Sequence, residues 1–261
     1  MTEQQVDLEQ DALEVVGRLE VASNETFLGR IGGATVVYKP VAGEKPLWDF
    51  PDGTLAGREV AAYLVSESLG WGVVPRTWLR DGPLGPGMVQ LWQEQDRDQD
   101  PVDVVPAHAA RRDGRRVVLE GSDENDEPVW LVHEDSPSLR RMAVFDAVVN
   151  NADRKGGHVL PLHDGRRLGV DHGVTFHVEP RLRTVLWGWV GEPLLDDELD
   201  GVRRVRAGLE DSREGGLGGR LAALLDDVEL VALAERCDRL LRTPVFPSPE
   251  GDMPAVPWPL F

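Results

Sequence analysis

Two short stretches, NNADRKGGH at residues 150–158 and VDHGVTF at residues 170–176, decide the predicted fold of this 261-residue chain. The first follows an apolar helical pattern and precedes a strand, and the second comes directly after the second strand of a predicted hairpin. Each stretch carries an aspartate, Asp153 or Asp171, in a loop beside that hairpin, so we expect the two carboxylates to converge on one edge of it. Such a pair suits phosphoryl transfer, because one carboxylate can deprotonate an attacking hydroxyl while the other holds a metal ion that bridges the phosphates.

The residues around these stretches predict a mainly helical second half. Pro137 is favourable as the first residue of a helix and Ser136 as its cap, and apolar residues continue along one face to Val149. The other elements expected here are strands at 158–162 and 167–170, helices at 196–209 and 219–241, and a second hairpin at 116–119 and 129–132.

The first half predicts a small antiparallel sheet and one helix. A Gly32-Gly33 pair between two apolar runs is typical of a hairpin turn. Gly70 follows an amphipathic pattern and is expected to end a helix there. The expected elements are strands at 13–21, 26–31 and 34–39, a helix at 55–69 that Thr54 can cap, and strands at 73–79 and 88–92 around a turn at 81–83.

The pair of motifs resembles a known superfamily. Asn-x-Asp-Arg followed by Asp-x-Gly-x-x-Phe is similar to the catalytic and metal-binding loops of the phosphatidylinositol 3-/4-kinase-like superfamily, which includes HipA-type kinases and type II phosphatidylinositol 4-kinases. In motif order the resemblance covers residues 15–190, and the whole chain is similar to an actinobacterial branch of kinase-like proteins. The resemblance implies an α+β, protein-kinase-like two-lobed fold, with a β-rich N-lobe that holds one helix and a mainly helical C-lobe. We therefore expect an N-lobe at residues 1–93, a C-lobe at 94–243 and a Pro-rich tail at 244–261.

The resemblance also implies roles for single residues. Asp153 corresponds to the catalytic base and Asp171 to the metal ligand. Lys39, at the end of the third strand, would bind the α- and β-phosphates of ATP, and Glu59 on the following helix is its natural ion-pair partner. Taken alone, Lys39 is also compatible with a surface lysine that ends an edge strand.

Two further groups are implied to bind the nucleotide. Ser23, Asn24 and Thr26, in the break between the first two strands, would form the loop that covers the phosphates, where small polar side chains and backbone N–H groups can replace a glycine-rich sequence. The strand at 89–92, with Gln90 and Trp92, would be the hinge that contacts adenine.

His158 departs from the family pattern, which has an asparagine as second metal ligand five residues after the base. Imidazole is a softer ligand than an amide oxygen, and Mg²⁺ prefers oxygen ligands. One hypothesis is that His158 binds the metal and favours Mn²⁺ over Mg²⁺. The other is that the imidazole only fills the loop and hydrogen-bonds to a neighbour.

Composition limits the partners. The net charge is -18, which repels nucleic acid and anionic membrane surfaces at long range. The sequence has neither a signal peptide nor an apolar run of membrane-spanning length, and a single cysteine excludes an internal disulfide, so we expect a soluble cytoplasmic protein with no stable membrane association. No Gly-x-x-x-x-Gly-Lys-Ser/Thr motif is present, which disfavours a P-loop NTPase.

These observations predict a kinase-like phosphotransferase that uses ATP with Mg²⁺ or Mn²⁺. The acceptor is an unknown hydroxyl, on a small molecule or a protein rather than on an anionic lipid. Two alternatives stay open: a nucleotide-binding pseudokinase that acts as a regulatory module, which the His158 departure favours, and a protein nucleotidyltransferase.

Overall fold

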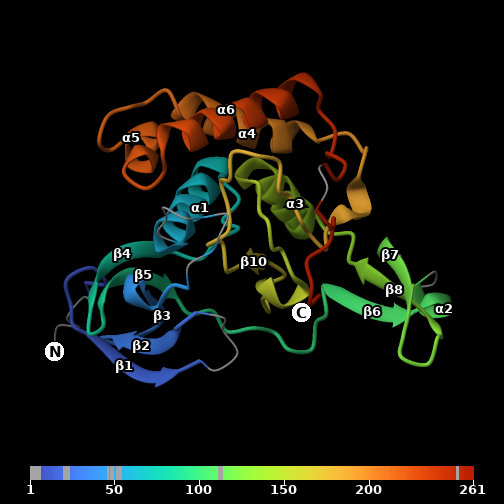
Figure 1. The fold of residues 1–261 in the computed structure, drawn as a ribbon, viewed down its shortest axis with the longest axis horizontal. Helices are drawn as coiled ribbons and strands as arrows, with labels where there is room; N and C mark the ends of the chain where they lie inside the picture. The colour runs from blue at the N-terminus through green and yellow to red at the C-terminus, as the bar shows by residue number, and fades with distance from the viewer. Residues whose placement is uncertain are drawn as a thin grey trace.

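The computed structural model describes residues 7–19, 24–45, 47, 50, 55–110, 114–250 and 253–261. The fold is α+β, with a β-sheet in the N-terminal part and helices in the C-terminal part, which confirms the predicted fold class (Figure 1). A short hairpin lies between these two parts, and a second small sheet extends from the far side of the helical part. Ser23 and Thr54 lie outside the described residues.

The N-terminal sheet has five strands in the order β1-β2-β3-β5-β4, and every neighbouring pair is antiparallel. Its apolar side chains form a cluster of their own, with Ile31, Val36, Tyr38 and Val89 buried between the strands. The strands are β1 (Leu13–Arg18), β2 (Phe27–Ile31), β3 (Ala34–Pro40), β4 (Thr77–Gly82) and β5 (Gly85–Leu91), and a short 3₁₀ turn, η1 (Val41–Gly43), follows β3.

Two details of this sheet differ from the prediction. The fourth strand begins at Thr77 instead of residue 73, because Val73 and Val74 are buried in a loop where their backbone contacts Ser66 and Gly169. Val73 and Val74 are apolar because they are buried in the core, and they do not belong to a strand. The turn between β4 and β5 lies at 83–84, two residues later than its expected start.

Helix α1 (Leu55–Leu69) has the predicted bounds and ends at Gly70, whose φ of 75° is the left-handed conformation that glycine favours. Its buried residues belong to the same apolar cluster as those of the C-terminal helices and Met88 of β5, whereas most buried side chains of the sheet form a separate cluster. Arg204 on α4 (Asp196–Gly208) donates hydrogen bonds to the carbonyls of Ser68 and Leu69 at the end of α1. The helix therefore packs against both the helical part and the sheet. The boundary at residue 93 stays a prediction.

The helical part is built on α3 (Pro137–Val149), which also has the predicted bounds. Ser136 Oγ accepts a hydrogen bond from Leu139 N at 3.2 Å, so the predicted cap is confirmed. The other helices are α4 (Asp196–Gly208), α5 (Leu217–Ala222) and α6 (Asp227–Arg242). The single helix predicted at 219–241 is wrong: residues 223–226 separate α5 from α6, and Asp226 N donates to the Glu229 carboxylate at 3.1 Å where α6 begins.

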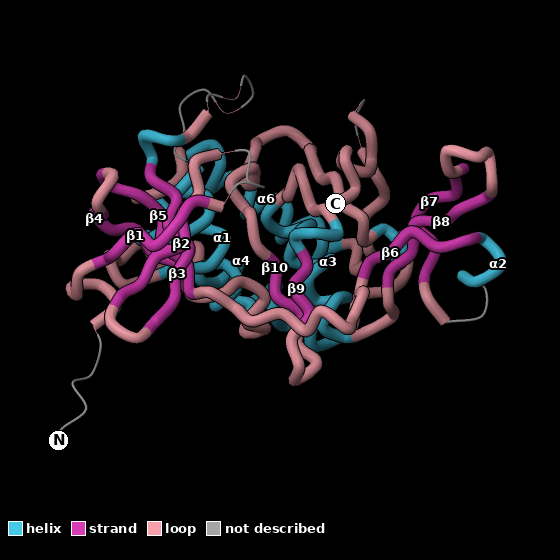
Figure 2. Tube along the Cα trace, turned by 90° about the horizontal axis from the view of Figure 1, so that it is seen from below, coloured by secondary structure: helices cyan, strands magenta, loops and turns pink. Residues whose placement is uncertain are grey.

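The two small sheets complete the fold. In Figure 2 the hairpin of β9 (Val159–Pro161) and β10 (Arg167–Gly169) lies between the five-stranded sheet and a three-stranded sheet of order β6-β8-β7. The predicted second hairpin corresponds to β7 (Arg116–Ser122) and β8 (Pro128–His133). Strand β6 (Val102–Pro106), which the short helix α2 (Ala107–Ala110) follows, was not predicted, because its alternation of polar and apolar residues lies in an acidic loop region. Two 3₁₀ turns, η2 (Gly156–His158) and η3 (Trp187–Trp189), lie further along the chain.

None of the helices in the described ranges combines the length and the apolar composition needed to span a lipid bilayer.

Because of the buried His133 at the end of β8, we expect the free energy of unfolding to fall in acid. Its Nδ1–H donates to the carbonyl of Glu134 at 2.8 Å and its Nε2 accepts from Gly188 N at 3.0 Å, so the buried ring is neutral. Burial lowers the pKa of His133 from 6.5 to about 4. Between these two values the unfolded chain binds the extra proton, so this histidine's contribution to stability is lost as the pH falls from about 6.5 to 4, by at most about 3 kcal/mol.

Urea unfolding at a series of pH values tests this expectation on the wild type and on His133→Gln, which cannot titrate in this range. The free energy of unfolding of the wild type should fall more steeply with acid, by at most about 1.4 kcal/mol per pH unit. Equal acid slopes in the two proteins would contradict the neutral buried ring.

Candidate active site

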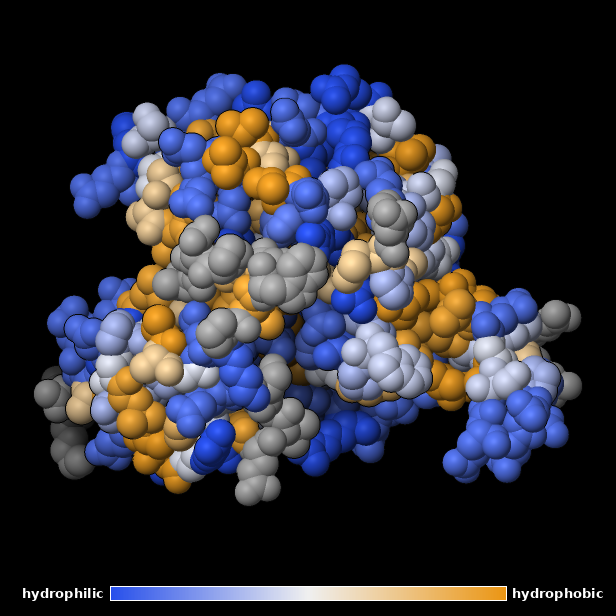
Figure 3. Space-filling model, in the orientation of Figure 1, coloured by the Kyte–Doolittle hydropathy of each residue, from blue (hydrophilic) through white to orange (hydrophobic). Residues whose placement is uncertain are grey.

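The candidate site is a cleft between the N-terminal sheet and the helical part. Two adjoining cavities, of about 210 and 490 Å³, share Lys39 and Asp171 in their walls. Figure 3 shows a hollow near the middle of this face of the molecule. The smaller cavity contains Asp153 and Asn24, and the larger contains Gln90 and Trp92. Residues predicted for phosphate chemistry and for adenine contact therefore lie in neighbouring parts of one cleft.

Lys39 joins the sheet to the other side of the cleft. Its Nζ lies 2.7 Å from Glu59 Oε1 and 2.9 Å from Asp171 Oδ1, so the predicted Lys39–Glu59 pair is present. Burial alone would lower the pKa of Lys39, but the Asp171 and Glu59 carboxylates outweigh it and raise the pKa well above its usual range. The lysine is thus held as a cation at the centre of the cleft, 132 residues away in sequence from one of its partners.

Glu59 also positions the loop that carries Asp171. Its second oxygen, Oε2, accepts a hydrogen bond from His172 N at 2.9 Å, and the Glu59 side chain is only 2% exposed. Asp171 itself has a φ of 61°, a left-handed conformation that is uncommon for a residue with a side chain and is typical of functional sites. The charge of Lys39 is the main cause that lowers the pKa of Asp171, so its carboxylate is ionised.

Asp153 lies in the second loop, after α3. Its backbone N–H donates to Asn151 Oδ1 at 3.0 Å, a local turn typical of asparagine. Its Oδ2 lies 3.1 Å from Lys155 Nζ, and 29% of the Asp153 side chain is exposed. The Asp153 carboxylate therefore lines the smaller cavity with Lys155 beside it.

Arg154 fixes the loops of both aspartates. Its guanidinium is fully buried and binds both oxygens of the equally buried Asp146 on α3, at 2.8 and 2.9 Å. Its Nη1 donates to the carbonyls of His158 and Val170, each at 3.2 Å, which connects the loop of Asp153 with the residue before Asp171. The close approach needs glycine at 169, where an added Cβ would lie 2.9 Å from Arg154 Nη2.

His172 is the third member of this buried network. Arg154 Nη2 donates to His172 Nε2 at 2.7 Å, so the ring is neutral with its proton on Nδ1. Burial, and then the charge of Arg154, lower the pKa of His172 well below its usual value. The ring packs edge-on against Phe145 of α3, with the centroids 5.3 Å apart. His172 therefore packs inside the protein and supports the loop that carries Asp171.

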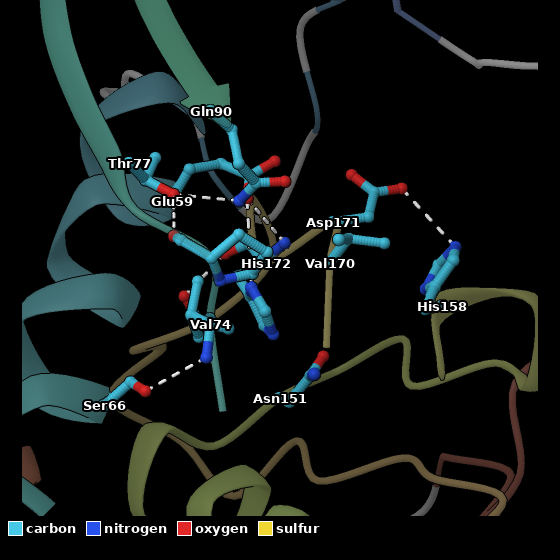
Figure 4. A network of polar contacts seen from close by, with 12 residues as sticks. Glu59, Ser66, Val74, Thr77, Gln90, Asn151, His158, Val170, Asp171 and His172 are labelled. Carbon is cyan, nitrogen blue, oxygen red and sulfur yellow. Dashed lines mark hydrogen bonds and ion pairs between the residues drawn. The ribbon is translucent and has the colours of Figure 1, made fainter. Parts of the chain in front are cut away.

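His158 lies beside Asp171, as Figure 4 shows. Its Nδ1 donates to the carbonyl of Asp153 at 2.9 Å, and a backbone oxygen can only accept, so the proton of the neutral ring is on Nδ1. Burial lowers the pKa of His158, although Asp171 acts in the opposite direction. The lone pair of Nε2 then lies 3.5 Å from Asp171 Oδ2. Two electron-rich atoms that face each other at this distance suit a cation bound between them.

The predicted nucleotide contacts are only partly brought together. Gln90 is buried, and its amide donates to Thr77 Oγ1 at 2.8 Å, so its side chain is already engaged. Trp92 lies on the wall of the larger cavity, with its Nε1 2.9 Å from Glu94 Oε1. Thr26 is buried near the same cavity, whereas Asn24 lines the smaller one. The backbone amides of Leu91 and Trp92 are engaged as well, since they donate to Arg76 O at 2.9 Å and to Thr35 O at 3.0 Å.

Sequence reasoning missed three members of the site. Asp146 and Arg154 are the buried pair described above, and Lys155 is the lysine beside Asp153. A signal for Lys155 was present, since it follows the predicted base Asp153 by two residues in the same motif. Asp146 could not be found, because a lone aspartate on an apolar helix face has no partner until the chain folds.

Comparison with known proteins finds a relative that is similar over most of its length. Protein Rv2133c of Mycobacterium tuberculosis is 52% identical over 262 residues, which cover 95% of this chain and 92% of that protein. The chain belongs to the Rv2133c family. No protein-family model matches it. Among solved structures, the crystal structure of a Helicobacter pylori proinflammatory kinase, CtkA, has a TM-score of 0.48 and 12% identity, and covers 93% of this chain and 96% of that chain.

The Asp146–Arg154 pair gives a stability prediction for this member of the Rv2133c family. Asp146→Ala leaves a fully buried guanidinium without its counter-charge, which typically costs about 3–5 kcal/mol. The matched control is Asp164→Ala, which removes an exposed carboxylate that pairs with Arg166 at 2.7 Å and should cost less than about 1 kcal/mol. Urea unfolding at pH 7 compares the two, and equal losses would contradict the role of the buried pair.

Proposed function

We propose that this chain is an ATP-dependent phosphotransferase of the phosphatidylinositol 3-/4-kinase-like type, with Asp153 as base and Asp171 as metal ligand. The observation that carries the proposal is the pairing of Lys39 with both Glu59 and Asp171 in a cleft that Asp153 also lines. A lysine on a sheet, a glutamate on the adjacent helix and two loop carboxylates are the groups that kinase-type phosphoryl transfer needs.

The residues beside Asp171 suit a divalent cation. Within the described ranges no group of three or more His, Cys, Asp or Glu side chains converges as a metal site. The Asp171 carboxylate and His158 Nε2, 3.5 Å apart, provide two donors, and Mg²⁺ in nucleotide sites commonly takes one or two protein ligands and completes its shell with phosphates and water. When bound, the metal would neutralise charge on the phosphates.

The chain's own groups would divide the reaction between them. Lys39, released from Asp171 toward the nucleotide, would bind the α- and β-phosphates, and Glu59 would keep it in place. Asp153 would accept the proton of the acceptor hydroxyl as the acceptor oxygen bonds to the γ-phosphorus. The bond from that phosphorus to the bridging oxygen would break, and ADP would leave. Lys155, 3.1 Å from Asp153, would counter the negative charge on the phosphoryl group.

The charge of the chain favours an uncharged or cationic acceptor. At a net charge of -18, an anionic bilayer would be repelled, so a hydroxyl on a small molecule or a protein suits this site better than a phosphoinositide headgroup. Adenine would occupy the larger cavity, against the backbone near Gln90 and Trp92.

Two substitutions test the roles of the carboxylates. Asp171→Asn should abolish metal-dependent transfer and weaken binding of metal-ATP, because it removes a charged ligand. Asp153→Asn should leave ATP affinity close to the wild type and lower turnover about 10²- to 10⁴-fold, the usual contribution of a positioned base. Calorimetric ATP titration and transfer of radiolabelled γ-phosphate measure the two effects.

The control for this experiment is Asp164→Asn, in an exposed turn, which should change neither quantity. If Asp153→Asn loses ATP affinity as severely as Asp171→Asn, the assigned roles are wrong. Mass spectrometry of the products separates the alternatives: a phosphate adduct supports transfer, an AMP adduct indicates nucleotidyl transfer, and ATP binding without product indicates a pseudokinase.

His158 gives a prediction about the metal. A nitrogen ligand shifts preference from Mg²⁺ toward Mn²⁺. We expect tighter metal-ATP binding or faster turnover with Mn²⁺ in the wild type, and improved use of Mg²⁺ in His158→Asn. Titration of both proteins with both metals measures this, and the same preference in the two would remove His158 from the metal site.

A further inference from the structure

The loop after Asp153 contains two consecutive glycines. Gly156 and Gly157 follow Lys155 directly, and glycine has more backbone freedom than any other residue. The proposed base and the proposed metal ligand His158 lie on either side of this pair. A catalytic loop needs a fixed geometry, because a misplacement of about 1 Å can cost 10²-fold in rate. Something outside the loop has to restrain it.

The tail of the chain supplies a direct contact with these glycines. Gly156 N donates a 2.8 Å hydrogen bond to the carbonyl of Leu260, and the Phe261 ring lies next to Gly156. A Cβ at Gly156 would be 2.6 Å from Phe261 Cδ1 and closer still to Cε1, whereas a Cβ at Gly157 would be no nearer than 3.7 Å to the same residue. Neither glycine has a positive φ, so only the ring excludes a side chain at Gly156. In Figure 1 the C-terminus lies beside the turn that precedes β9.

The same tail also binds Thr184 and Trp187, in a segment that pairs with Arg154. Ala255 O accepts hydrogen bonds from Thr184 N at 3.1 Å and from Trp187 Nε1 at 2.8 Å. Thr184 in turn pairs with Arg154 in a parallel bridge, where Arg154 N donates to Arg183 O at 3.0 Å and Val185 N donates to Arg154 O at 3.1 Å. The loop is therefore held at Arg154 by residues 183–185, which the tail also binds, and at Gly156 by Leu260 and Phe261.

We propose that residues 254–261 form a strap that positions the catalytic loop, with Phe261 and the Leu260 carbonyl fixing Gly156. The strap contacts neither of the proposed carboxylates, so Phe261 is a positioning residue that acts through Gly156 and Lys155. The inference rests on the proposed function for its effect on turnover, but the contact itself can be tested without any activity. Phe261 is 55% exposed, so its loss should affect the loop far more than global stability.

Three variants test the strap: Phe261→Ala removes the ring, Gly156→Ala displaces it, and the double variant does both. Each single change should lower turnover of γ-phosphate from ATP about tenfold with little change in ATP affinity. The loss in the double variant should be no greater than the larger single loss, because the two residues act as one unit. Trp258→Ala, an 81% exposed tryptophan in the same strap, is the control and should match the wild type.

Amide hydrogen exchange at Gly156 gives a readout that needs no substrate. Exchange should be faster in Phe261→Ala and Gly156→Ala than in Trp258→Ala. If exchange responds in this way but the wild type transfers no phosphate from ATP, the proposed phosphotransferase function is wrong and the strap is supported. Wild-type turnover and unchanged exchange in Phe261→Ala would overturn the strap. The strap would also be overturned if the losses of turnover in the two single variants added up in the double variant. A rise in turnover would overturn it too, because it would mean that the tail blocks the site.

Discussion

The buried ion pair of Arg154 and Asp146 is the interaction on which the candidate site depends. A guanidinium with no exposed surface is tolerated only with a counter-charge and nearly complete hydrogen bonding, and Asp146, two backbone carbonyls and His172 provide both. These partners come from α3, from the loop of Asp153 and from the loop of Asp171. Their positions are therefore coupled: none can move without leaving a charge or a polar group unpaired in the core.

A second constraint concerns α1, which carries Glu59. Arg58, its neighbour, donates to Thr175 O at 2.8 Å and pairs with Glu229 of α6 at 2.6 Å, so this helix is tied to the loop that follows Asp171 and to the helical part. Most buried side chains of the sheet form a cluster of their own, but Met88 of β5 belongs to the cluster of α1 and the helical part, so the sheet also packs against this unit. The Lys39–Glu59 pair adds an ionic contact between the sheet and α1. Movement of the sheet relative to α1 would change the distance between the lysine and the carboxylates.

Local chemistry explains where prediction from sequence succeeded and where it did not. Both α1 and α3 were predicted with correct bounds, because Gly70 and the Ser136-Pro137 pair end or begin a helix through their own backbone preferences. Val73 and Val74 were assigned to a strand although they are buried in a loop, since apolar runs do not show what buries them. Strand β6 was missed because its pairing with β8 depends on residues about 30 positions away.

The sequence by itself determined the order of motifs, and from it the fold class and the identity of Lys39, Glu59, Asp153 and Asp171 as candidates. The spacing of these side chains along the chain can be read directly from the sequence. The tertiary structure alone decided that Lys39 also pairs with Asp171, that Asp146 holds Arg154, and that Phe261 lies against Gly156. These contacts join residues that are brought together only by the packing of the folded chain. The order of residues in the sequence does not show which neighbour a buried charge or a glycine will contact.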